Sequence, residues 1–167
     1  MDNRFNTGNP IVNAILAPLR AINVMLLQTG SRFFGTDHET SDWDYIVWSE
    51  EEKLQEVVGI DFYLLLEALG WKEKKGSGSL CYGSSFITKT FRQVRQGVQV
   101  DIMVVHNVSK IIYARNLIRD AGIAYLLTDQ NRNWIWDNAV KIAESYHYDD
   151  AVNILRATVL ALSAINN

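Results

Sequence analysis

The sequence has little cysteine, proline or histidine, with one, two and three residues of these types among 167. Cys81 is the lone cysteine, which excludes an internal disulfide and favours a reducing, cytoplasmic location. No apolar run in the sequence approaches the length of about 20 residues that a membrane-spanning helix requires. Its opening segment, MDNRFNTGNP, lacks the basic start and apolar run of a signal peptide. We therefore expect no membrane partner.

An excess of positive charge is also missing. The chain carries 16 lysines and arginines against 19 acids, which gives a formal net charge of -3. Domains that bind long nucleic acids mainly by neutralising phosphates are usually basic, so the net charge argues against this class but does not exclude a short or local contact. The length suits a single domain over residues 1–167. Within it we expect a catalytic core at about 10–108 and C-terminal helices at about 109–167.

The first part of the chain alternates between helix and strand patterns. Asn9-Pro10 is a typical helix start, and we expect this helix to end or kink near Pro18. The apolar run at 22–27 predicts a buried strand, and 30–35 predicts a turn with one short helical turn. Residues 43–48 predict a second strand.

The remainder predicts one helix, a loop, a hairpin and a helical C-terminal part. The expected elements are a helix from Ser49 to about Leu69 that stops at Gly70, a polar loop at 72–83, hairpin strands at 85–94 and 98–105, and helices at 109–119 and 134–165 with a break near 146–150. This order predicts an α+β fold, with a small mixed β-sheet packed against helices.

Three aspartates carry the chemical argument. Asp42 and Asp44 are two residues apart on a predicted strand, so both carboxylates point to the same face. Asp101 lies on another predicted strand, out of phase with its apolar neighbours. If these strands are neighbours, three carboxylates converge and require cations between them. Oxygen ligands favour Mg²⁺ or Mn²⁺, and two such ions are able to clamp the attacking and leaving oxygens of a phosphoryl displacement.

A glycine and a serine directly after the predicted strand add to this argument. Gly30 lets the backbone approach a phosphate closely, and the Ser31 hydroxyl is a further donor. The backbone N–H groups of Ser31 and Arg32, at the start of a helical turn, are suited to triphosphate oxygens. A plain strand-to-helix turn has the same pattern, so this feature gains its meaning from the aspartates.

The segment GSRFFGTDHETSDWDYIVW resembles the signature of the DNA polymerase β-like nucleotidyltransferase superfamily, and is most similar to the minimal nucleotidyltransferases. The matching positions are Gly30, Ser31, Arg32, Gly35, Thr36, Ser41, Asp42 and Asp44, with Asp101 in VQVDIMVV as the third carboxylate. Trp43 departs from the pattern, because an aliphatic residue usually stands between the acids. The resemblance covers about residues 25–105 and leaves the C-terminal helices without a matching motif.

The resemblance implies transfer of a nucleoside monophosphate from an NTP to a hydroxyl. It implies that Gly30 and Ser31 hold the triphosphate, with Arg32 either on phosphate or in solvent. It further implies two Mg²⁺ or Mn²⁺ ions, both bound by Asp42 and Asp44, with Asp101 on the ion that activates the acceptor. The acceptor stays open between a protein side chain, an RNA end and a small molecule. A helical partner protein or a second copy of the chain is expected beside the site.

Two other classes of function stay open. The first is a catalytically silent protein of the same fold that binds or inhibits a partner macromolecule, and the second is a nucleotide sensor that does not transfer. Metal-dependent turnover of NTP separates the enzyme from both.

Several further residues have a less specific meaning. The glycines at 76–83 favour a flexible loop over a dinucleotide site, because a helix precedes them. Surface charge is the default for Lys89, Arg92 and Arg95 on the hairpin, although they are suited to steer an anion. The three histidines are too scattered for a metal site. Helix-packing is expected for Trp134 and Trp136, and an interface role for their exposed faces together with Tyr146 and Tyr148.

Overall fold

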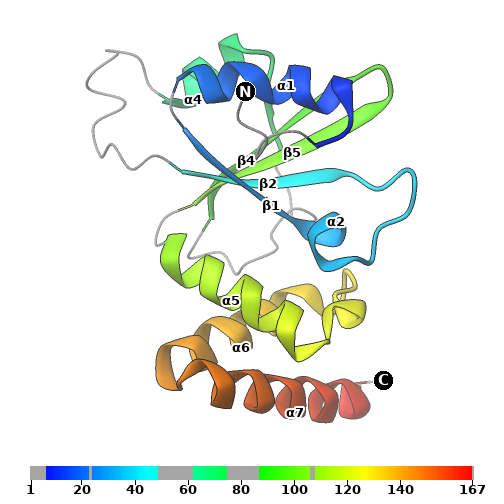
Figure 1. Cartoon of the computed structure of the whole chain (residues 1–167), viewed down its shortest axis with the longest axis vertical. Coiled ribbons are helices and arrows are strands. Elements are labelled where there is room, and N and C mark those ends of the chain that lie inside the picture. The colour runs from blue at the N-terminus through cyan, green and yellow to red at the C-terminus, as the bar shows by residue number, and fades with distance from the viewer. Residues whose placement is uncertain (1–6, 23, 49–61, 75–86, 106–107, 167) are drawn as a thin grey trace. The chain divides into compact units, whose positions relative to one another are not determined.

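The protein has an α+β fold in the computed structural model, which describes residues 7–22, 24–48, 62–74, 87–105 and 108–166 (Figure 1). Five strands form one sheet in the order β1-β2-β5-β4-β3. The elements are α1 (Pro10–Ala21), β1 (Met25–Thr29), α2 (Gly30–Phe34), β2 (Trp43–Trp48), α4 (Phe62–Ala68), β3 (Lys72–Glu73), β4 (Ile87–Arg95), β5 (Val98–Val105), α5 (Val108–Ala121), η3 (Ala124–Leu126), α6 (Arg132–Ser145) and α7 (Tyr148–Asn166). The predicted fold class is therefore confirmed.

The sheet is mixed, with one parallel pair at its centre. β1 runs antiparallel to β2, and β3 runs antiparallel to β4. β2 and β5 are parallel neighbours although about fifty residues separate them in the chain. β4 and β5 form the expected hairpin around Gln96 and Gly97, whose φ angles of 51° and 78° are typical of a two-residue hairpin turn.

The chain divides into two compact units. The first comprises Met1–Phe33, Asp37–Lys75 and Lys89–Val104, and the second comprises Phe34–Thr36, Gly76–Thr88 and Val105–Asn167. The expectation of one domain over residues 1–167 is kept as a prediction. Among the described residues, none of the helices is both long and apolar enough to cross a membrane.

In the first unit, α1 and α4 lie on one face of the sheet and share a core with it (Figure 1). The Asn9 side chain caps α1 by accepting hydrogen bonds from the N–H groups of Ile11 and Val12, at 2.9 and 3.3 Å. The helix does not end near Pro18, because α1 continues to Ala21, and a kink at Pro18 stays a prediction. Leu19, just beyond the proline, is fully buried, and this burial favours the helix over the lost backbone hydrogen bond.

Two predicted boundaries in the first unit are wrong. The first strand begins at Met25 rather than at Ile22, because the Ile22 N–H donates to the Leu19 carbonyl and closes α1. This strand is at the sheet edge and is only partly buried. Lys72–Glu73, expected in a loop, forms the short strand β3 on β4. The predictions for residues 49–61 and 75–86 fall outside the described residues.

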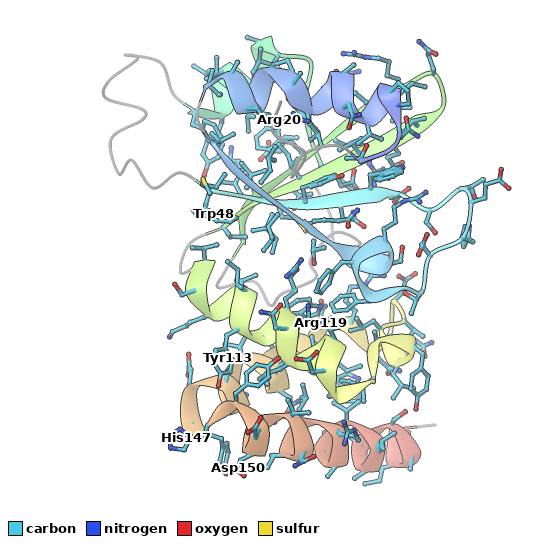
Figure 2. All side chains as sticks on the ribbon, in the orientation of Figure 1. Arg20, Trp48, Tyr113, Arg119, His147 and Asp150 are labelled. Carbon is cyan, nitrogen blue, oxygen red and sulfur yellow. The ribbon has the colours of Figure 1, made fainter. Side chains whose placement is uncertain are left out.

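The second unit contains the helices α5, α6 and α7, with the break between α6 and α7 at Tyr146-His147 as predicted. Figure 2 labels Tyr113 on α5 and His147 near the start of α7. Trp136 is 2% exposed and packs edge-to-face with Phe34 of the same unit. An interface role for Trp136 is therefore wrong, whereas the expected packing role is confirmed. Tyr146 is half exposed.

Candidate active site

Asp44 and Asp101 are direct neighbours across the parallel β2–β5 pair. Their sequence neighbours on the strands, Tyr45 and Ile102, are buried in the core beneath α1 and α4. Because side chains alternate along a strand, the two aspartates point to the opposite face. Paired strands lie about 4.8 Å apart, so the two side chains start from adjacent positions. The sheet therefore brings together two acids that are distant in the sequence.

Gly30 lies directly against the Asp44 carboxylate. It follows β1 and opens α2, with a φ angle of 73° that L side chains rarely adopt. A β-carbon on residue 30 would lie 2.2 Å from the Oδ2 atom of Asp44 and 2.9 Å from its β-carbon. Both the backbone conformation and the available space therefore require glycine. Ser31 is the next residue, half-buried, and its role on the triphosphate stays a prediction.

Asp42 stands just before β2, two residues ahead of Asp44, and is exposed. Partial loss of water around its carboxylate raises the pKa of Asp42, and the negative charge of Asp101 raises it further. The charges of Arg92, Lys74 and Arg32 oppose this effect on the pKa. The second of these causes indicates that the charge of Asp101 acts on Asp42.

Asp101 has a cationic partner on the neighbouring strand. The Arg92 guanidinium donates from Nε to Oδ1 at 2.8 Å and from NH2 to Oδ2 at 3.1 Å. The Gln99 amide also donates to Oδ2, at 3.3 Å. Asp101 is only 7% exposed, so the carboxylate end of this bidentate pair is largely shielded from water. The hydrogen bond to Asp101 is the main cause that raises the pKa of Arg92, so Arg92 stays charged.

Arg32 makes several contacts with the loop that precedes β2 and carries Asp42. Its guanidinium donates to the Ser41 carbonyl at 2.8 Å and to the Glu39 carbonyl at 3.3 Å, and approaches the Asp37 carboxylate at 3.5 Å. It also lies 4.0 Å from the centre of the Trp43 ring. The unusual tryptophan between the acids therefore has a structural partner. The phosphate contact of Arg32 stays a prediction.

The fit of a divalent metal ion differs between the three aspartates. Asp42 and Asp44 supply carboxylate oxygens at one edge of β2, which suits a Mg²⁺ ion that takes its other ligands from phosphates and water. Asp101 does not fit as a third ligand while Arg92 and Gln99 bind both of its oxygens. Within the described ranges, no group of three His, Cys, Asp or Glu side chains is arranged to hold a metal ion.

A cavity lies at the edge of the sheet next to Arg92. Its volume is about 350 Å³, and its lining is Gly70, Lys72, Glu73, Lys74, Arg92, Gln93 and Val94. Lys72 is paired with Arg92 across β3 and β4, so both side chains lie on the face that carries Asp101. Glu73 is neutralised by Lys89 at 3.2 Å. The remaining charged groups of the lining are cations.

Arg92 belongs to the site, although the sequence pattern alone favoured surface charge for all three cations of the hairpin. A signal was present in the sequence. Counting outward from the two turn residues Gln96 and Gly97 places Arg95 opposite Val98, and therefore Arg92 opposite Asp101. An arginine directly opposite an aspartate on adjacent strands predicts an ion pair between them.

Comparison with known proteins gives structural likenesses only. No protein-family model matches the sequence, and no curated protein matches it. Cid1 poly(U) polymerase with bound magnesium and 3′-dATP is 18% identical, with a TM-score of 0.44 over 85% of this chain and 43% of that chain. A structure of Cid1 described for its RNA terminal uridylyl transferase activity is 17% identical, with a TM-score of 0.43 over 86% and 42%. A cytoplasmic RNA terminal U-transferase is 18% identical, with a TM-score of 0.41 over 81% and 38%.

The chain is similar in structure to Cid1, a DNA polymerase β-like nucleotidyltransferase. The chain spans less than half of the length of these enzymes. At these identities and TM-scores the likeness carries no argument about this chain, and the activities of those enzymes do not transfer with it.

Proposed function

We propose that the protein is a metal-dependent nucleotidyltransferase that moves a nucleoside monophosphate from an NTP to a hydroxyl acceptor. The observation that carries this proposal is the pairing of Asp44 with Asp101 on parallel strands, with Gly30 held against Asp44 by a positive φ angle. A structural sheet edge does not need a glycine in contact with a carboxylate. A phosphate-binding turn beside metal-binding acids does need this close approach.

The proposed reaction is a single displacement at the α-phosphorus. The acceptor oxygen bonds to that phosphorus, the bond from the phosphorus to the α–β bridging oxygen breaks, and pyrophosphate leaves. A bound divalent cation neutralises charge on the triphosphate and polarises its oxygens. Asp42 and Asp44 hold this cation, and the Gly30 backbone and Ser31 hydroxyl hold the triphosphate. Asp101 has about one lone-pair position left beside Arg92 and Gln99, and this position would receive the proton of the acceptor hydroxyl.

The cavity beside Arg92 supports an acceptor that bears phosphate. Its lining includes Arg92, which donates a hydrogen bond to Asp101, together with Lys72 and Lys74. Phosphate groups are attracted to such a set of cations, and the attraction is local enough to act in a chain of net charge -3. We therefore place an RNA end ahead of a protein side chain as the acceptor. A partner protein or a second copy of the chain is proposed to complete the acceptor side.

A catalytically silent binding protein is the second candidate, and one observation favours it. The bidentate pair between Arg92 and Asp101 neutralises a carboxylate that an active enzyme of this type uses. Such a protein would bind a partner or a nucleotide without transfer.

The two candidates are separated by turnover. The protein is incubated with each of the four NTPs, labelled at the α-phosphate, together with Mg²⁺ or Mn²⁺ and either total RNA or a cell lysate. An enzyme releases pyrophosphate and labels a macromolecule, and EDTA or Asp44→Asn abolishes the labelling. If no NTP gives a labelled product under any of these conditions, the silent binding protein is the better conclusion.

A further inference from the structure

We propose that Arg92 takes the place of a metal ion at Asp101, so that the site binds one divalent cation, at Asp42 and Asp44, instead of two. This inference rests on the proposed function. It concerns the number of ions and the part played by Arg92, which neither the motif nor the structural likenesses assign.

The first argument is the hydrogen-bonding capacity of the Asp101 carboxylate. An ionised carboxylate offers about four lone-pair positions to donors or cations. Oδ1 accepts from Arg92, and Oδ2 accepts from both Arg92 and Gln99. Three of these positions are therefore used by side chains of the protein itself. The carboxylate has little capacity left for a hydrated ion.

The second argument is charge. Arg92 stays protonated, and its positive charge is stabilised by Asp101 first and then by Asp42 and Asp44. The guanidinium therefore stands inside the electrostatic field of all three acids. A divalent ion on the oxygens of Asp101 would lie beside this guanidinium and be repelled by it. Asp42 and Asp44 are the two acids proposed to hold one ion, together with the phosphates of the substrate.

The third argument is access. The side chain of Asp101 is 10% exposed, whereas that of Arg92 is 31% exposed. The arginine is therefore the more exposed member of the pair, and it lines the cavity together with Lys72 and Lys74, whereas Asp101 does not. An ion that arrives from solvent meets the positive side chain first. A planar guanidinium in a bidentate pair is also well suited to hold the carboxylate in one orientation.

The test counts bound ions directly, without relying on activity. Native mass spectrometry measures how many Mn²⁺ ions accompany each protein molecule in complex with inorganic tripolyphosphate, a mimic of the NTP tail that does not depend on the base. We expect one ion for the wild type. Arg92→Gln, which removes the charge and exposes the Asp101 carboxylate, is expected to bind two. Arg92→Lys keeps the charge and is expected to bind one.

Two further variants make the count independent of folding defects. Arg92→Gln combined with Asp101→Asn removes both ends of the pair, leaves no buried charge, and is expected to return to one ion. Arg95→Gln makes the same change at an exposed position of the same strand and is expected to keep one ion.

Two ions on the wild type, or one ion on a folded Arg92→Gln variant, would overturn the inference and leave the proposed transferase in place. A wild type that forms no complex with Mn²⁺ and tripolyphosphate would overturn the proposed function, and the inference with it.

Discussion

Gly30 and Asp44 are in such close contact that a β-carbon on residue 30 would lie 2.2 Å from the Asp44 Oδ2 atom. The contact joins the turn after β1 to the acid on β2, across the antiparallel β1–β2 pair. The position of the metal-binding carboxylate is thus coupled to the turn proposed to hold the triphosphate.

Gly30→Ala is therefore expected to lower the free energy of unfolding for two reasons. The positive φ angle of 73° costs an alanine about 1–2 kcal/mol, and the contact with Asp44 adds about 1–3 kcal/mol of overpacking. Gly97→Ala is the matched control, because its φ angle is 78° but no atom lies within 4 Å of the added carbon. Urea unfolding should show a larger loss for Gly30→Ala, together with loss of transfer. Equal losses for the two variants would contradict the role of the contact.

The acids differ in their effect on stability, and Asp42 is expected to be the destabilising one. Its pKa is raised, so the folded state binds the proton more tightly than the unfolded state, whose pKa is near 3.8. Stability is therefore lost as pH rises through the raised pKa. Asp42→Asn should be slightly more stable than the wild type at neutral pH, and the gain should vanish below pH 3.8. Thermal unfolding between pH 3 and 7 measures this difference.

Asp101→Asn is expected to have the opposite effect. It leaves Arg92 without its bidentate partner at a site that is 7% exposed in the wild type, which costs about 1–3 kcal/mol at neutral pH. Relief of repulsion among the acids does not offset this loss, because Arg92 already neutralises Asp101. Arg92→Gln/Asp101→Asn should recover part of the stability in the same urea titration. A gain in stability for Asp101→Asn alone would show that the pair contributes nothing.

The sequence was sufficient to predict β2 and β5, because β2 is a short run of apolar and aromatic residues interrupted only by Asp44, and β5 begins with alternating apolar and polar residues. Their neighbouring position was only a condition of the argument, since parallel pairing across a long connection is set by the whole fold. The start of β1 and the existence of β3 were missed, because both depend on contacts with other segments, the end of α1 and the edge of β4.

Arg32→Lys distinguishes a loop brace from a phosphate ligand. A lysine keeps the positive charge that would bind phosphate but cannot donate together to the Ser41 and Glu39 carbonyls. If Arg32 acts through the loop, Arg32→Lys should lose about 1–3 kcal/mol of stability and weaken binding of magnesium and NTP. Calorimetry with and without Mg²⁺ measures the binding. Unchanged stability with retained affinity would favour the direct phosphate contact instead.

The last prediction concerns the acceptor, and it uses the cations of the cavity next to Arg92. Lys72 and Lys74 line this cavity, and Lys74 is close enough to Asp42 to lower its pKa. A phosphate-bearing acceptor that reaches Asp101 from this side would release counterions from its phosphates as the lysines bind them.

Lys72→Ala/Lys74→Ala should therefore weaken labelling of RNA and make it less dependent on salt. The slope of log affinity against log salt should fall by about 1 for each lysine that contacts phosphate. Binding of NTP, which is proposed to use Gly30 and Ser31 on the other side of the acids, should change little. Lys110→Ala/Lys141→Ala, at exposed positions of α5 and α6, is the control and should leave the slope unchanged. If the cavity variant keeps the salt slope of the wild type, or if the labelled species is a protein, the acceptor does not bind through this cavity.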